Sequence, residues 1–157
     1  MLDSTTIIDY NYQDFLNGIQ NIVNQIKESQ YSPEYIVGIV RGGAVPAVHL
    51  SHKLKVPTIM LQWSTRDYEH WNTSITWIPE DINAGKKILL VDDIIDGGET
   101  IREILEDWNT CIREPLNTDN IKIASLIYNT AQETIPDFYD RTIDRNKDGR
   151  WFVFPWE

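Results

Sequence analysis

Residues 87–100 read KILLVDDIIDGGET, and their pattern is the clearest indication of the fold class of the chain. Residues 87–91 form the clearest buried strand in the sequence, because apolar residues follow one another without polar alternation. Two glycines and a threonine come after the acidic residues, and apolar residues then recur at helical spacing. These helical positions are Ile101, Ile104, Leu105 and Trp108. A buried strand that leads directly into an amphipathic helix predicts an α/β fold.

Similar strand and helix patterns occupy the rest of the chain. The expected strands are 35–40, 57–63 and 121–128, with a short extended segment at 151–154, and the expected helices are 11–30 and 44–54. Residues 64–79 are polar, contain several aromatic residues and show no period, so we expect a mobile loop or an irregular hairpin there. Strands that alternate with helices predict an α/β architecture with a doubly wound, mainly parallel sheet.

Length and charge restrict the class of protein. A chain of 157 residues with 41% hydrophobic residues can bury one core, so we expect residues 1–157 to form a single domain. The formal net charge of −10 argues against a protein that binds the nucleic-acid backbone. The apolar runs are far shorter than the roughly 20 residues that cross a membrane. Cys111 is the only cysteine and the start does not resemble a leader, so a cytoplasmic protein without an internal disulfide is expected.

Residues 92–100 combine side chains and glycines that could bind a ligand. Their two glycines let the backbone curl so that N–H groups point inward, and the dipole of the following helix and the Thr100 hydroxyl add attraction for a phosphate. Asp92 and Asp93 suit sugar hydroxyls, or a magnesium ion (Mg²⁺) that neutralises phosphate charge. Together these groups predict a site for a phosphorylated sugar. The alternative is that the carboxylates only end a strand and the glycines only make a turn.

Three segments resemble a known family. Residues 91–100 resemble the phosphoribosyl pyrophosphate (PRPP) signature of type I phosphoribosyltransferases. Residues 40–47, VRGGAVPA, resemble the pyrophosphate loop of that family, especially in the small xanthine-guanine enzymes of bacteria and their archaeal relatives. Residues 151–157, WFVFPWE, are similar to the segment that covers the purine in that subgroup. The resemblance extends over roughly residues 10–157, and it implies a purine phosphoribosyltransferase whose terminal segments form a small hood.

The resemblance assigns the PRPP site residue by residue. It implies that Asp92 and Asp93 bind the ribose hydroxyls and Mg²⁺, and that residues 96–100 hold the 5′-phosphate. Arg41 and Gly42 would bind pyrophosphate, in a loop that in relatives often contains a non-proline cis peptide. The PRPP-binding residues implied in this way are Arg41, Gly42, Asp92, Asp93, Asp96, Gly97, Gly98, Glu99 and Thr100.

The resemblance also implies a mechanism and a site for the base. Transfer would pass through an oxocarbenium-like state at C1 of the ribose, while Mg²⁺ and Arg41 stabilise the departing pyrophosphate. Asp96 would handle the proton on N7 of the purine. Residues 64–79 correspond to the loop that closes over the site and excludes water. The base-binding residues implied are Asn129, Trp151, Phe152 and Val153, with Phe152 stacking on the base.

Three departures from the family leave the substrate open. Gly97 stands where relatives have Thr or Ser, and Glu99 adds negative charge beside the phosphate site. Residues 64–65 are Ser-Thr where relatives often have Ser-Tyr, with Tyr68 further along. Asn129 stands in place of the Lys of 6-oxopurine enzymes, and its amide can donate or accept a hydrogen bond. Guanine, xanthine or hypoxanthine is still favoured, because the terminal segment resembles the part that reads their edge.

Two functional hypotheses follow. In the first, an enzyme acts on PRPP and a purine base and releases pyrophosphate and a nucleoside monophosphate, as a homodimer or tetramer. In the second, a PRPP-sensing regulatory protein binds PRPP or a nucleotide without efficient transfer, which Gly97 and Asn129 would favour.

One further motif gives a weaker signal. Residues 144–149 match the first half of an EF-hand calcium loop, but Pro155 stands at the twelfth position in place of Glu. We therefore expect an acidic turn before the last strand.

Overall fold

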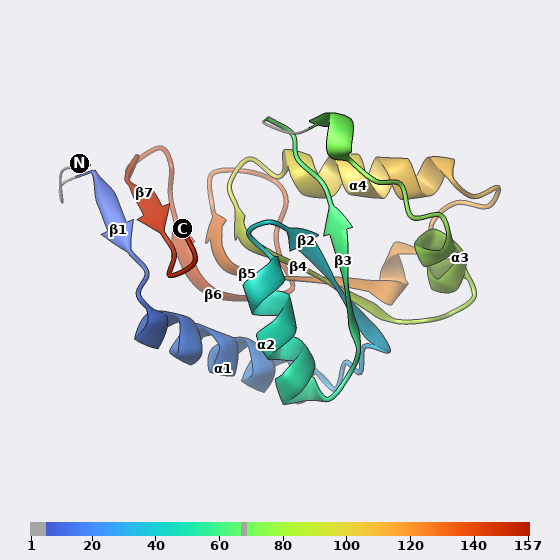
Figure 1. Cartoon of the computed structure of the whole chain (residues 1–157), viewed down its shortest axis with the longest axis horizontal. Helices are drawn as coiled ribbons and strands as arrows, with labels where there is room; N and C mark the ends of the chain where they lie inside the picture. Colours follow the sequence, from blue (N-terminus) through green and yellow to red (C-terminus); the bar gives the residue numbers. More distant parts are fainter. Residues whose placement is uncertain (1–5, 67–68) are drawn as a thin grey trace.

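The computed structural model describes residues 6–66 and 69–157, and at its centre lies a sheet of five parallel strands. The strand order is β3-β2-β4-β5-β6 (Figure 1). The bounds of these strands are β2 Tyr35–Val40, β3 Thr58–Gln62, β4 Ile88–Ile95, β5 Ile121–Asn129 and β6 Phe138–Ile143. The helices are α1 Tyr12–Ser29, α2 Ala44–Leu54, α3 Trp77–Asn83 and α4 Glu99–Thr110, with 3-10 turns at η1 Glu69–Trp71 and η2 Thr118–Asn120. The doubly wound α/β fold expected from the sequence is confirmed.

Helices cover both faces of the sheet, and β4 shows how its sequence allows this. Leu89 and Val91 pack in one buried cluster, whereas Ile88 and Leu90 point to the other face and pack in a second cluster. Side chains of α1 and α2 complete the first cluster, and side chains of α3 and α4 complete the second. Because both faces of β4 are covered, its apolar run needs no polar alternation.

The two ends of the chain form the hood. β1 (Ile7–Asp9) and β7 (Trp151–Val153) pair in parallel as a separate two-stranded sheet (Figure 1). The N–H of Tyr10 extends this pairing by donating to the carbonyl of Val153 at 2.9 Å. Phe152 is buried in the first cluster and so anchors the hood on the core. The hood of terminal segments is thereby confirmed.

Two strands differ from the sequence-based expectation. β4 continues past Val91 to Ile95, because β5 pairs with it as far as Tyr128. The first two carboxylates of the chemical motif therefore lie within a strand. The sequence does not predict β6, since only its first and last residues, Phe138 and Ile143, are buried and such a polar edge strand shows no apolar run.

The stretch expected as a loop at 64–79 contains more regular structure than predicted. It includes η1, and α3 begins at Trp77 because Ile78 is buried in the second cluster. Pro79 lies in the first turn of α3, where a proline is tolerated, so it does not break the helix. Tyr68, which was singled out for the closing loop, lies outside the described residues.

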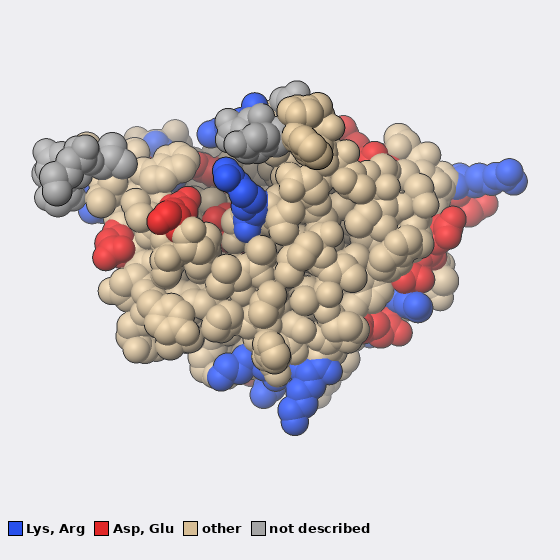
Figure 2. Space-filling view, viewed as in Figure 1, with Lys and Arg blue, Asp and Glu red and all other residues tan. Residues whose placement is uncertain are grey.

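The surface carries its charge unevenly. Figure 2 shows Lys and Arg side chains gathered at the rim beneath α1 and α2, where Lys27, Lys53 and Lys55 line a groove. These lysines lie at the carboxyl ends of the two helices, where positive charge complements the helix dipole. Among the helices of the described residues, none has both the length and the apolar character that crossing a membrane requires.

Candidate active site

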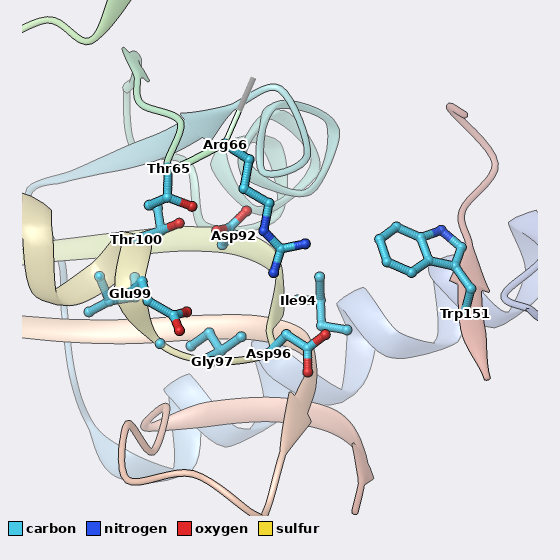
Figure 3. A pocket seen from close by; sticks show the side chains of 12 residues that line it. Thr65, Arg66, Asp92, Ile94, Asp96, Gly97, Glu99, Thr100 and Trp151 are labelled. Atoms are coloured by element: carbon cyan, nitrogen blue, oxygen red, sulfur yellow. The ribbon is translucent and has the colours of Figure 1, made fainter. Parts of the chain in front are cut away.

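Three adjoining hollows lie at the carboxyl ends of β2 and β4, the edge at which open α/β sheets bind ligands. The loop hollow (Figure 3) is lined by Thr65, Arg66, Asp92, Ile94, Ile95, Asp96, Gly97, Gly98, Glu99, Thr100, Ile101 and Trp151. The hood hollow is lined by Asp93, Ile94, Asp96, Arg145, Trp151, Phe152, Phe154 and Glu157. The arginine hollow is lined by Ile39, Val40, Arg41, Gly42, Trp63, Ser64, Thr65, Arg66, Asp92, Thr100 and Trp151. Trp151 lines all three, so the hollows belong to one continuous site.

The loop hollow is built around the start of α4. Gly98 precedes the helix in a left-handed conformation with φ of 80°, which glycine adopts at low cost. The first N–H groups of a helix lack partners within the helix and attract anions. Arg102 holds the turn by donating to the carbonyl of Gly97 at 3.0 Å, and its guanidinium lies 4.0 Å from the Glu99 carboxylate. The segment predicted to hold the 5′-phosphate therefore lines one wall.

Asp92 and Asp93 are neighbouring carboxylates near the end of β4. The N–H of Asp93 donates to Oδ1 of Asp92 at 2.9 Å, and the N–H of Ile94 donates to Oδ1 of Asp93 at 2.7 Å. Burial raises the pKa of Asp93 to about 6. Burial, together with the charge of Asp93, raises the pKa of Asp92 well above its usual range.

This carboxylate pair fits a bound Mg²⁺ ion. A divalent cation prefers oxygen ligands and would offset the repulsion between two neighbouring, half-buried acids. Within the described residues, no three or more His, Cys, Asp or Glu side chains are grouped to hold a metal ion. The remaining ligands of a Mg²⁺ ion held by Asp92 and Asp93 would therefore come from the substrate and water.

The pyrophosphate loop expected after β2 approaches these carboxylates. The peptide between Val40 and Arg41 is cis, the feature that the family resemblance implies. A Cβ atom on Gly42 would collide with the Asp93 carboxylate, so glycine allows the loop to lie this close to β4. Arg41 and Gly42 line the arginine hollow together with Asp92. The fold thus brings the two predicted parts of the PRPP site together.

Asp96 lies between the loop hollow and the hood hollow, paired with Arg145. Nε of Arg145 donates to Oδ1 of Asp96 at 3.0 Å, and Nη2 donates to Oδ2 at 3.2 Å. The Asn129 amide supports both partners, because its Nδ2 donates to the Asp96 carbonyl at 3.1 Å and its Oδ1 accepts from the Arg145 N–H at 3.1 Å. The same oxygen accepts from the Ala131 N–H at 2.9 Å. The buried amide of Asn129 therefore binds backbone groups, and its contact with a base stays a prediction.

The base-binding residues predicted in the hood lie at different depths. Trp151 is 53% exposed, whereas Phe152 is only 5% exposed and its ring centre lies 6.3 Å from that of Phe154. Val153 offers its carbonyl to Tyr10 across the hood. Trp151 therefore presents the more open aromatic surface, and stacking by Phe152 stays a prediction.

Arg66 and Arg145 line the hollows, although sequence reasoning did not single them out. Figure 3 shows the Arg66 side chain extending into the loop hollow, and Arg66 also lines the arginine hollow. A basic residue in a segment without periodicity gives no signal by its spacing. Arg145 lies in the predicted turn at 144–149, and the structure has a turn there at residues 145–147. Because acidic residues surround Arg145 in the sequence, the pattern indicated only an acidic turn.

The sequence and the fold both match known proteins. The family described as Phosphoribosyl transferase domain matches residues 10–157. The chain belongs to this family. The match covers every residue assigned to the three hollows and agrees with the resemblance that the PRPP signature indicated.

Relatives of this chain differ in the base that their names state. The xanthine-guanine phosphoribosyltransferase of Vibrio atlanticus is 27% identical over 147 residues, which cover 90% of this chain and 85% of that protein. Orotate phosphoribosyltransferase 2 of Mesorhizobium japonicum is 32% identical over 101 residues, which cover 64% of this chain and only 46% of that protein. A crystal structure of a purine phosphoribosyltransferase from Pyrococcus horikoshii shares the fold, with a TM-score of 0.67, 24% identity and coverage of 97% of this chain and 94% of the other. The similarity to purine-type proteins thus extends over nearly the whole chain, whereas the chain spans about half the length of the orotate relative.

Proposed function

We propose that this protein transfers the 5-phosphoribosyl group of PRPP to a purine base, releasing pyrophosphate and forming a nucleoside monophosphate. The observation that carries the proposal is that the loop hollow and the hood hollow adjoin along Ile94, Asp96 and Trp151. The helix start in the first hollow suits a phosphate, and the aromatic side chains of the second suit a flat base. Guanine, xanthine and hypoxanthine are the favoured bases, supported by the coverage of the xanthine-guanine relative.

On the sugar-phosphate side, each group has a distinct task. Backbone N–H groups of residues 97–100 hold the 5′-phosphate, and Asp92 and Asp93 accept hydrogen bonds from the ribose hydroxyls. A Mg²⁺ ion held by the same two carboxylates would neutralise charge on the pyrophosphate. Arg41 and Arg66, which both line the arginine hollow, bind the pyrophosphate and stabilise its charge as it leaves.

The transfer step joins the two hollows. A ring nitrogen of the base attacks C1 of the ribose, the bond from C1 to the pyrophosphate oxygen breaks, and its electron pair leaves with the pyrophosphate. The proton lost by the base passes to the Asp96 carboxylate, which lines both hollows. Water would compete for C1, so Thr65 and Arg66, which border the loop hollow, would help to exclude it.

A steady-state assay tests the proposal. PRPP and Mg²⁺ are supplied with guanine, xanthine, hypoxanthine, adenine or orotate in turn, and pyrophosphate release is measured. We expect turnover with at least one 6-oxopurine and none with orotate. Turnover with orotate alone would contradict the proposal.

A second candidate function, a PRPP-sensing regulatory protein, is favoured by Gly97 and Asn129, which depart from the family pattern, and Glu99 bears on how tightly such a protein would bind PRPP. A Cβ atom on Gly97 would collide with the Glu99 carboxylate, so this acid lies against the turn where the phosphate is expected. Its negative charge should weaken phosphate binding. Tight PRPP binding without turnover of any base would favour this candidate over the enzyme, and Glu99→Gln should then tighten PRPP binding further.

A further inference from the structure

Arg145 enters the hood hollow from the connection between β6 and β7, outside the PRPP motif. Among the described residues that line this hollow, it is the only Lys or Arg, and three carboxylates accompany it, those of Asp93, Asp96 and Glu157. A ligand in this hollow therefore meets many side-chain acceptors and few donors. Apart from the indole N–H of Trp151, the side-chain donors of this wall are those of Arg145.

The guanidinium of Arg145 is held in a fixed orientation. Nε and Nη2 donate to the two carboxylate oxygens of Asp96 at 3.0 and 3.2 Å, and Nη1 donates to the carbonyls of Arg150 and, at 3.5 Å, Asp148. A guanidinium has five N–H donors, so these contacts within the described residues leave one N–H on Nη2 for a ligand. Its side chain is only 19% exposed, which limits the alternative positions it can take.

Asp96 keeps acceptor capacity in the same arrangement. Each carboxylate oxygen has two lone pairs and receives one hydrogen bond from Arg145, so one lone pair on each oxygen stays available. Asn129 binds the backbone of both residues, at the Asp96 carbonyl and the Arg145 N–H, and so fixes their separation. Asn129 is in this sense a positioning residue for the pair.

We propose that Arg145 determines which base is accepted, with its remaining N–H donating to an exocyclic oxygen of the base while Asp96 accepts from the neighbouring ring N–H. The inference rests on the proposed function and names the substrate class: purines with an oxo group at position 6. In a purine with an amino group at position 6, the amino N–H would face the N–H of the Arg145 guanidinium. Two donors would then meet without an acceptor between them, and neither would form a hydrogen bond.

Hypoxanthine and adenine test this inference, because the first has an oxo group and the second an amino group at position 6. The parent protein should prefer hypoxanthine by at least about tenfold in kcat/KM. Arg145→Gln removes the charge and should lower this preference by about tenfold to a hundredfold. Arg145→Lys keeps the charge but not the fork of donors, so it should keep part of the preference. Arg150→Gln is the matched control in the same connection, because that side chain pairs with Asp148.

The outcomes separate this inference from the proposed function. A merely structural role of Arg145 would lower kcat/KM for both bases equally and leave their ratio unchanged, which would overturn the inference. The inference would also be overturned if the parent protein showed no preference between the two bases, or if Arg150→Gln shifted the ratio of kcat/KM values as much as Arg145→Gln does. Calorimetry with inosine and adenosine monophosphates gives a second readout: if the protein turns over no base but binds the 6-oxo nucleotide more tightly, and Arg145→Gln removes that difference, transfer fails and the inference stands.

Discussion

The loop hollow and the hood hollow share Asp96 but are assembled in different ways. The loop hollow takes most of its lining from one continuous segment, residues 92–101, which offers backbone N–H groups and carboxylates. The hood hollow takes its lining from the end of β4 and the residue that follows it, from the connection between β6 and β7 and from the end of the chain. It offers aromatic rings, a guanidinium and three carboxylates. Under the proposed function, the 5′-phosphate would therefore be held mainly by one local turn, whereas base choice would depend on how distant segments dock. Changes in the turn at residues 97–100 or in the Asp92 and Asp93 carboxylates should alter PRPP binding, and changes at Arg145 should alter base preference.

The largest effect is expected from removing both carboxylates at the end of β4. Asp92→Ala combined with Asp93→Ala should weaken PRPP binding in the presence of Mg²⁺ by at least about a hundredfold, because charge-assisted hydrogen bonds and the cation site are lost together. Calorimetry measures the Kd, and Glu106→Ala on the exposed side of α4 is the control. PRPP binding as tight as in the parent protein would show that these carboxylates do not contact the sugar.

Asp96→Asn tests the residue shared by the two hollows. The amide keeps the shape of the side chain but cannot take a proton, so kcat should fall by roughly a hundredfold while the Kd for PRPP changes much less. Steady-state turnover and calorimetry on the same preparation give the two values. Equal turnover in parent and variant, where chemistry limits the rate, would remove Asp96 from the mechanism.

A smaller effect should follow from adding one methyl group to the pyrophosphate loop. Gly42→Ala places a Cβ against the Asp93 carboxylate and should weaken PRPP binding about tenfold, because it would displace this carboxylate from the ribose, and loss of one such hydrogen bond costs about 1–3 kcal/mol. Gly149→Ala is the matched control, since a Cβ there meets no atom within 4 Å. The ratio of hypoxanthine to adenine turnover should stay constant in both variants. A changed ratio in Gly42→Ala would contradict the assignment of PRPP binding and base preference to separate groups of residues.

The smallest effect concerns stability and pH. Burial raises the folded-state pKa of Asp93 to about 6, so the folded protein binds more protons than the unfolded chain between about pH 4 and pH 6. Stability of the ligand-free protein should therefore fall as the pH rises through this window and stay lower above it. Asp93→Asn should raise the free energy of unfolding by roughly 1–2 kcal/mol at pH 7.5 and by little at pH 4. Urea unfolding at both pH values measures this, with exposed Asp119→Asn as control; an equal gain at both values would contradict the electrostatic cause.

The contrast between a hollow built from one continuous segment and a hollow built from distant segments also explains which features the sequence predicts. The bounds of β2 and α2 and the turn at residues 97–98 are predictable, because apolar runs and glycines determine the backbone conformation of the residues next to them in the sequence. The pairing of Asp96 with Arg145 joins residues 49 positions apart, and only the docking of the hood on the sheet brings them together. β6 escapes prediction for a related reason, since a polar edge strand is recognised by its partner strand and not by its own composition.

A crystal structure of the protein with bound guanosine monophosphate would show whether one ligand spans both hollows across Asp96. We predict the phosphate at the N–H groups of residues 97–100, the ribose hydroxyls at Asp92 and Asp93, and the base in the hood hollow with its oxygen toward Arg145. A phosphate bound away from the start of α4, or a base outside the hood hollow, would contradict the account.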